Sequence, residues 1–535
     1  MDGRRRWTPE QGIKRLLRSS IHGPRSRRAC DSCRVRKCDL MSPCSSCVAA
    51  QLDCTFTAPV RKRGPRPRHC VPLNDTPASP TALAPSPDSL SNYSQNESAV
   101  EDVVMGSPRE ETGMVTITTE LQHQLGVEVD GLQRILLHCS AVFLDKLYPL
   151  EPLVHPTALP QTCREMYQRL RDPRQAHHHR HLVELAQIAA LCAKTLIVLP
   201  REVTESEPHW AAAFYQASRQ ALARLGDRDL EHPTVDSIVA RYYQSGYLHH
   251  QGKASTSWIV LGEAIRMADV LDLHREPATL EPDPWARELR RRVFWILFTA
   301  DRSASCLMRR PASFRVDASD EINTLFPDEE AFDHPGTGVS PLVGFNLNTR
   351  LWRTADQLLR EIRSLHLQRR ETSLDEAHIR ALYLSFETCL DSAPRALHPP
   401  AIFETVPLPP RLAIQCANLH ISFQCLRIKC LYALEALYRD HACPTWSHAA
   451  VCLKKIELAR EMLQIIRWVS IDSLKVNGES CVEKLRIAGA ALLEVINHDE
   501  DAALISRART QLDTFIHILA ELNSKAVDEL AGEAG

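Results

Sequence analysis

The sequence predicts a mainly α protein with a small cysteine-rich module near its N-terminus, a disordered linker and a large all-helical domain. Three observations support this prediction. Six of the 18 cysteines fall within residues 30–54, and residues 71–112 contain six prolines and seven serines. From about residue 130 onward, apolar residues recur at the three-and-four spacing of amphipathic helices. Hairpin signals with alternating β-branched runs are absent.

The charge of this 535-residue chain is strongly asymmetric, although its net value is only −2. Residues 1–70 contain 17 Lys and Arg against 5 Asp and Glu, so the remainder is acidic. A basic N-terminal segment joined to an acidic remainder is typical of a protein that binds nucleic acid through the basic segment. Residues 1–29 form a basic N-terminal arm that we expect to be disordered, with phosphate contacts or nuclear import as the alternative interpretation.

The cysteines of residues 30–54 follow the pattern C-x2-C-x4-C-x5-C-x2-C-x6-C. Thiolates at this density form disulfides or metal sites. Residues 1–6 are not followed by the apolar segment of a secretory signal, so we expect a reducing compartment and therefore zinc. Six thiolates can hold two zinc ions if two of them bridge both metals. The predicted ligands are Cys30, Cys33, Cys38, Cys44, Cys47 and Cys54.

Residues 28–39 and 42–47 of this stretch resemble the fungal zinc binuclear cluster, the DNA-binding module of many fungal transcription factors. The resemblance implies that Cys30 and Cys44 are the bridging thiolates. It also implies that Lys37 contacts guanine in the major groove of double-stranded DNA, in CGG-type triplets. The side chains expected to neutralise phosphates are Arg34, Arg36, Arg61, Lys62 and Arg63.

The spacing between Cys33 and Cys38 departs from the family, which normally has six residues here instead of four. Two missing residues would rotate a helix by about 200°, so Cys38 would point away from the metals unless the backbone rearranges. Three explanations stay open. The gene model lost six nucleotides at an exon junction, which we favour, or the cluster tolerates the shortening, or DNA binding is impaired.

Two linkers are expected after the cysteine module. Residues 55–70 form a basic linker, because five of the eight residues 61–68 are Lys or Arg and prolines keep the segment extended. Residues 71–115 form a Pro/Ser-rich linker with too few bulky apolar side chains to fold. Between Leu125 and Phe143 the apolar residues step by four and three, which predicts the first core helix of a domain, with a short coiled coil as the alternative.

The remaining chain, residues 116–530, is predicted to be one all-helical regulatory domain. Residues 242–275 and 288–311 resemble the middle homology region that follows the zinc cluster in fungal transcription factors, which we place at about 130–390. Their apolar stripes indicate core packing and no catalytic motif. The predicted helical segments are 182–199, 210–225, 234–250, 255–273, 285–309, 347–365, 374–390, 412–438, 449–469, 481–496 and 502–522.

Other classes of protein have little support in the sequence. The phosphate-binding loops, the H-E-x-x-H motif and the nucleophile elbow are absent, so we predict that the chain is no enzyme. No uninterrupted apolar run approaches the length of a membrane span, so no membrane partner is expected. A small-molecule pocket between the helices is conceivable, but nothing in the sequence names its ligand.

The sequence therefore predicts a nuclear, sequence-specific transcription factor that binds double-stranded DNA and acts on the transcription machinery. A secondary-metabolite gene cluster and carbon utilisation are the pathways we favour by resemblance, and homodimerisation is left open. One alternative is a regulator that no longer binds DNA, because of the shortened cluster, and acts through its helical domain on a partner factor. A second is a ligand-responsive receptor or an enzyme-like domain joined to a DNA-binding module, which a convergent polar cluster inside the helical domain would support.

Overall fold

The computed structural model divides the chain into two parts, Met1–Val104 and Met105–Gly535. The predicted zinc cluster, the basic linker and most of the predicted Pro/Ser-rich linker lie outside the residues it describes. All described residues belong to the second unit, which we call the helical unit. They are residues 108–171, 179–277, 283–308, 310–314, 322–330, 339–368, 376–399, 408–438 and 447–522.

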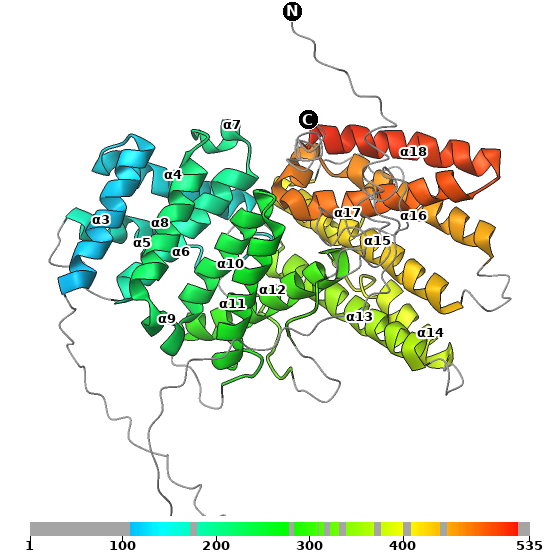
Figure 1. Ribbon diagram of the computed structural model, residues 1–535, viewed down its shortest axis with the longest axis horizontal. Helices are drawn as coiled ribbons and strands as arrows, with labels where there is room; N and C mark the ends of the chain where they lie inside the picture. Colours follow the sequence, from blue (N-terminus) through cyan, green and yellow to red (C-terminus); the bar gives the residue numbers. More distant parts are fainter. Residues whose placement is uncertain are drawn as a thin grey trace, which may run out of the picture. The chain divides into compact units, whose positions relative to one another are not determined.

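Every regular element in these ranges is a helix, as predicted (Figure 1). The N-terminal helices are α3 (Pro108–Leu125), α4 (Val129–Lys146), α5 (Leu159–Arg171), α6 (His179–Val198), α7 (Arg201–Thr204), α8 (Trp210–Leu225), α9 (Asp227–Glu231), α10 (Val235–His250), α11 (Ala254–Val270) and α12 (Pro284–Met308). The C-terminal helices are α13 (Pro341–Gln368), α14 (Glu376–Glu387), the 3₁₀ helix η3 (Arg395–Leu397), α15 (Pro410–Tyr438), α16 (His448–Trp468), α17 (Ile471–His498) and α18 (Ala502–Glu521).

Each group of helices packs around a central helix. Among the N-terminal helices α6 packs against α8 and α10, and among the C-terminal helices α15 packs against α13, α16 and α17. Helix α12 contacts α10 and α11 on one side and α13 on the other, so it joins the two groups (Figure 1). The stretch Arg180–Val198 in α6 is long and apolar enough to cross a membrane, but 72% of its most apolar window is buried among other helices. This burial identifies α6 as a core helix of the helical unit.

The structure corrects the predicted elements at three places. Helix α3 begins at Pro108, inside the segment for which a disordered linker was predicted, because the composition that predicts disorder ends at that proline. Helix α5 was not predicted, since only a few apolar residues mark its buried side. The segment predicted at 481–496 is the second half of the longer helix α17. Helix α4 is a core helix with buried Leu132, Leu136 and Phe143, as favoured over a coiled coil.

The cysteines of the helical unit that the structure describes are free thiols, and most of them are buried. Burial raises the pKa of the Cys416 thiol and of the Cys425 thiol to about 12, so both stay protonated at neutral pH. The buried cysteines therefore serve as small apolar core residues.

Candidate functional site

The residues predicted to bind zinc and DNA all lie outside the described residues, so their geometry stays a prediction. The predicted zinc ligands are Cys30, Cys33, Cys38, Cys44, Cys47 and Cys54, and the predicted DNA contacts are Arg34, Arg36, Lys37, Arg61, Lys62 and Arg63.

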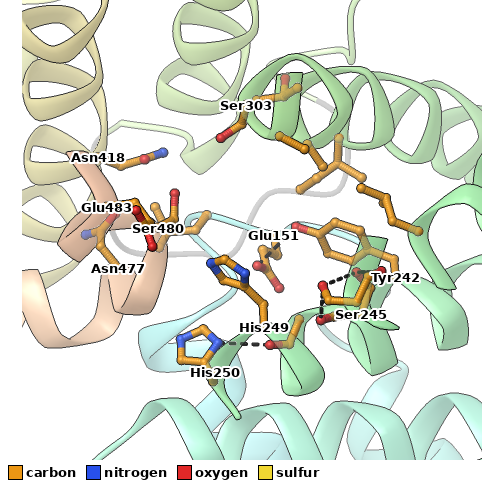
Figure 2. Close-up of a pocket in the computed structure, with 18 of the residues that line it drawn as sticks. Glu151, Tyr242, Ser245, His249, His250, Ser303, Asn418, Asn477, Ser480 and Glu483 are labelled. Atoms are coloured by element: carbon orange, nitrogen blue, oxygen red, sulfur yellow. Dashed lines mark hydrogen bonds between the residues drawn. The ribbon is translucent and has the colours of Figure 1, made fainter. Parts of the chain in front are cut away.

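The helical unit contains a cavity of about 230 Å³ between its N-terminal and C-terminal helices. One side is formed by the segment after α4 and by α6, α10, α11 and α12, and the other by α13, α15 and α17. Figure 2 shows the polar side chains Tyr242 and His249 from α10 on one side of this space, with Asn418 from α15 and Ser480 from α17 facing them. The cavity thus brings together polar groups that are far apart in the sequence.

Glu151 is the charged centre of the N-terminal wall. Its Oε1 accepts hydrogen bonds from the Lys194 ammonium and from the Tyr242 hydroxyl, the latter at 3.1 Å. Gly246 leaves room for the lysine, because a Cβ at this position would lie 2.8 Å from Lys194 Nζ. Burial and the charge of Glu151 raise the pKa of Tyr242 well above its usual value, so this hydroxyl remains a hydrogen-bond donor.

The opposite wall depends on a break in helix α17 at Gly478, which has φ 63° and ψ −153°. At this break the Glu479 N–H donates to His250 Nε2 at 3.2 Å. His250 Nδ1 lies 2.9 Å from the Gly246 carbonyl oxygen. Because Nε2 accepts and a carbonyl can only accept, the proton is assigned to Nδ1 and the ring is neutral. His250 therefore holds the bend of α17 against α10.

Two further basic side chains line the cavity. Burial, together with the charges of Lys194 and Arg486, lowers the pKa of His249 to about 4, so this ring is neutral near pH 7. Lys484 is only 3% exposed, and its ammonium donates to Asn418 Oδ1 at 3.3 Å. Burial lowers the pKa of Lys484, and no ion pair among the described residues involves it. The cavity therefore contains a buried ammonium with spare hydrogen-bonding capacity.

Among the described residues outside this cavity, one group has the chemistry to hold a metal. The ligand atoms of His448, Cys452 and Asp499 lie within 4.8 Å of one another. His448 Nε2 is 3.6 Å from Cys452 Sγ and 3.7 Å from Asp499 Oδ2. Asp499 also accepts a hydrogen bond from the Asp501 N–H at 2.8 Å. The three side chains join the start of α16 to the end of α17, which accounts for the group without a metal.

Sequence analysis did not identify the cavity residues. Tyr242, Ser245 and His249 recur at i, i+3 and i+7, so they form a polar stripe on one face of α10. This polar stripe could have indicated the cavity from the sequence, but residues 242–275 were interpreted only as core packing. The partners of these residues on α15 and α17 follow no local pattern, since tertiary packing alone brings them close.

Comparison with known proteins identifies two domains in the chain. Residues 28–63 match the fungal Zn(2)-Cys(6) binuclear cluster domain. Residues 141–342 match the fungal specific transcription factor domain. Both matches confirm the resemblances found in the sequence. The second includes all the segments that form the N-terminal side of the cavity, namely the segment after α4 and helices α6, α10, α11 and α12.

The similar curated proteins are fungal regulators. A maltose fermentation regulatory protein of Saccharomyces cerevisiae is 25% identical over 280 residues, covering 52% of this chain and 50% of the relative. An uncharacterized transcriptional regulatory protein of Schizosaccharomyces pombe is 23% identical over 456 residues, covering 70% of this chain and 57% of the relative. The arabinolytic transcriptional activator of Emericella nidulans is 43% identical over 58 residues, covering 10% of this chain and 6% of the relative. The chain thus spans about half the length of the first two relatives.

Proposed function

We propose that this chain, a fungal zinc-cluster transcription regulator by its two domains, acts in the nucleus as a sequence-specific regulator of genes for carbohydrate use. The observation that carries the proposal is the match of residues 28–63, which include all six clustered cysteines, to the zinc cluster domain. The names of two relatives, a maltose fermentation regulatory protein and an arabinolytic transcriptional activator, support carbohydrate use over a secondary-metabolite gene cluster.

In this proposal the thiolates of the six clustered cysteines hold two zinc ions, with Cys30 and Cys44 bridging both. The metals stabilise a module too short to fold on a hydrophobic core alone. Lys37 donates to guanine O6 and N7, which are acceptors in the major groove. The arginines at positions 34 and 36 and the basic segment 61–63 neutralise phosphates, so affinity for DNA falls with rising salt. The helical unit then serves as the regulatory domain.

Two sets of variants of the full-length chain test these roles. Lys37→Ala should reduce the preference for a CGG-bearing duplex over a changed triplet, since it removes a base contact. The triple variant Arg61→Ala, Lys62→Ala and Arg63→Ala should weaken binding to both duplexes alike and flatten the salt dependence. The measurement is fluorescence anisotropy across a salt series. Unchanged triplet preference in Lys37→Ala would show that another side chain contacts the bases.

The alternative is a regulator that no longer binds DNA, because only four residues separate Cys33 from Cys38. Zinc stoichiometry of the purified chain separates the two proposals. Two zinc ions per chain support the DNA-binding regulator, whereas one or none supports the impaired regulator acting through a partner factor. Sequencing the transcript across codons 36–39 determines beforehand whether the short spacing is genuine.

Ligand responsiveness is a second candidate function of the same chain. It is supported by the cavity of the helical unit, where charged and polar side chains of α6, α10, α15 and α17 converge. A molecule that contacts both walls would change how the N-terminal and C-terminal helices pack, and this is a physical route from ligand to regulation. The pocket's position between two groups of helices is typical of ligand sites.

A further inference from the structure

The cavity wall contains polar atoms that the protein itself does not satisfy. Among the described residues that line the cavity, Glu151 Oε2, Thr299 Oγ1 and Asn348 Oδ1 are buried without a hydrogen-bond partner. Thr299 and Asn348 also line an adjoining recess of about 30 Å³ with Asn418. Leaving a buried polar atom unpaired is costly, so the cavity is suited to an occupant that donates hydrogen bonds to these oxygens.

The charges on the wall indicate that this occupant is neutral. The acidic lining residues are Glu151 and Glu483, and the basic ones besides the two histidines are Lys194 and Lys484. Glu151 pairs with Lys194. Glu483 pairs with Arg486, whose Nη1 lies 2.8 Å from its carboxylate. Arg486 also lies 3.5 Å from Glu479, so Glu479 and Glu483 together balance Arg486 and Lys484. Since the charges around the cavity sum to zero and the histidines are neutral, an ionic ligand would leave an uncompensated charge.

The donor and acceptor pattern specifies the kind of neutral group. Glu151 and Asn348 offer acceptors, whereas Lys484 offers ammonium protons beyond the one directed at Asn418. A hydroxyl both donates and accepts, so a molecule with several hydroxyls satisfies both kinds of partner. The indoles of Trp258 and Trp352 and the aliphatic side chains of α11 and α12 supply apolar surface for its C–H faces.

The volume of the cavity limits the size of its occupant. A cavity of about 230 Å³ is smaller than the roughly 300–1,000 Å³ of pockets for drug-sized ligands. We propose that the cavity binds a neutral polyhydroxylated molecule the size of a single sugar ring, whose hydroxyls donate to Glu151 and Asn348 and accept from Lys484. This inference deepens the ligand-responsive part of the proposed function and rests on it, but it does not depend on how the chain binds DNA.

Calorimetric titration of the full-length chain tests the ligand class. The probes are D-glucose and L-arabinose as neutral single-ring polyols, D-gluconate as an anion of similar size, and maltose as a two-ring sugar. At least one single-ring sugar should bind, and the anion and the disaccharide should bind at least about tenfold more weakly. Tighter binding of gluconate or of maltose, or no binding of either single-ring sugar at millimolar concentration, would overturn the proposal.

Two shape-conserving variants locate the site. Thr299→Val and Asn348→Leu remove polar atoms that have no partner in the protein, so thermal unfolding without sugar should occur at an unchanged or higher temperature. Each should weaken sugar binding by about 3- to 10-fold, the loss of one neutral hydrogen bond. Retained affinity in both variants would place the sugar elsewhere and overturn the assignment.

The matched control is Thr195→Val in α6. The Thr195 hydroxyl is buried outside the cavity and donates to the Leu191 carbonyl at 2.8 Å. This variant should lower the unfolding temperature and leave sugar affinity unchanged. A parallel titration with DNA tests the DNA-binding proposal separately from the sugar site. Loss of sugar binding with intact DNA binding overturns only the ligand inference. If only water molecules occupy the cavity, none of the probes will give a heat of binding. That result also overturns the ligand inference.

Discussion

Arg292 in α12 is a fully buried charge, with 0% of its side chain exposed. Its guanidinium donates to the Glu288 carboxylate at 2.8 Å, to the Tyr148 hydroxyl at 3.1 Å and to the Pro152 carbonyl at 3.3 Å. The last two partners flank Glu151, the charged centre of the cavity wall. The neighbouring Arg291 is likewise ion-paired, with Glu276.

We predict that Arg292→Ala lowers the free energy of unfolding by about 3–5 kcal/mol, because it removes the nearer of the two arginines that pair with the buried Glu288. The matched control is Arg266→Ala, since Arg266 is 63% exposed and pairs with Asp269 on the surface of α11. The control should cost no more than about 1 kcal/mol. Urea unfolding followed by circular dichroism measures both. Similar losses in the two variants would contradict the role assigned to Arg292.

His249 predicts a dependence of stability on pH. Its pKa in the folded protein is about 4, below the ordinary value of 6.5. The unfolded chain therefore binds a proton more readily, so the stability contribution is complete above pH 6.5 and is lost as pH falls toward 4. His249→Gln should make the decline of unfolding free energy between pH 6.5 and 4 shallower. An unchanged slope in urea unfolding across this range would refute the assignment.

At the scale of the element, helix α17 shows where the sequence pattern stops being informative. Three-and-four periodicity located its second half correctly, because Val482, Leu485 and Leu492 are buried. The pattern was interrupted near Gly478, so the first half was missed. The interruption is itself structural, since the positive φ and ψ of −153° at Gly478 belong to a region that only glycine adopts readily.

We predict that Gly478→Ala destabilises the chain by about 2 kcal/mol or more, because an L residue is strained at this φ and its Cβ would lie 2.1 Å from His250 Nε2. The control is Gly262→Ala in α11, where a Cβ would meet no heavy atom within 4 Å. That change should stabilise the chain by about 0.5–1 kcal/mol, since alanine is the better helix former. Thermal unfolding of both variants should thus shift in opposite directions. Shifts of the same sign would contradict the assigned role of the bend.

The sequence was sufficient for the helical class and for most helices of the unit, because burial of one helix face imposes a local period. The cavity was not predictable to the same degree. Glu151, Lys194, Asn348 and Lys484 occupy four separate segments, and only the packing of α6, α13 and α17 brings them to one space. Helix ends such as Pro108 were also misjudged, since composition changes gradually across a boundary.

For the whole molecule, the chain joins a basic, cysteine-rich N-terminal region to an acidic helical unit that contains a polar cavity. The matches to the zinc cluster domain and to the fungal specific transcription factor domain fall in these two regions. Since the proposed DNA recognition lies in residues 28–63 and the proposed ligand binding in the helical unit, we expect that each role can be removed without the other.

The most direct test of the central claim is the affinity of the zinc-loaded full-length chain for labelled duplex DNA, measured by fluorescence anisotropy with the transcript confirmed. The account predicts that a CGG-bearing duplex binds at least about tenfold more tightly than one with the triplet changed, since each mismatched base pair costs about 1–3 kcal/mol. It also predicts that a zinc chelator abolishes this difference. Equal affinity for the two duplexes, with zinc bound, would contradict the claim that the cysteine module recognises DNA sequence.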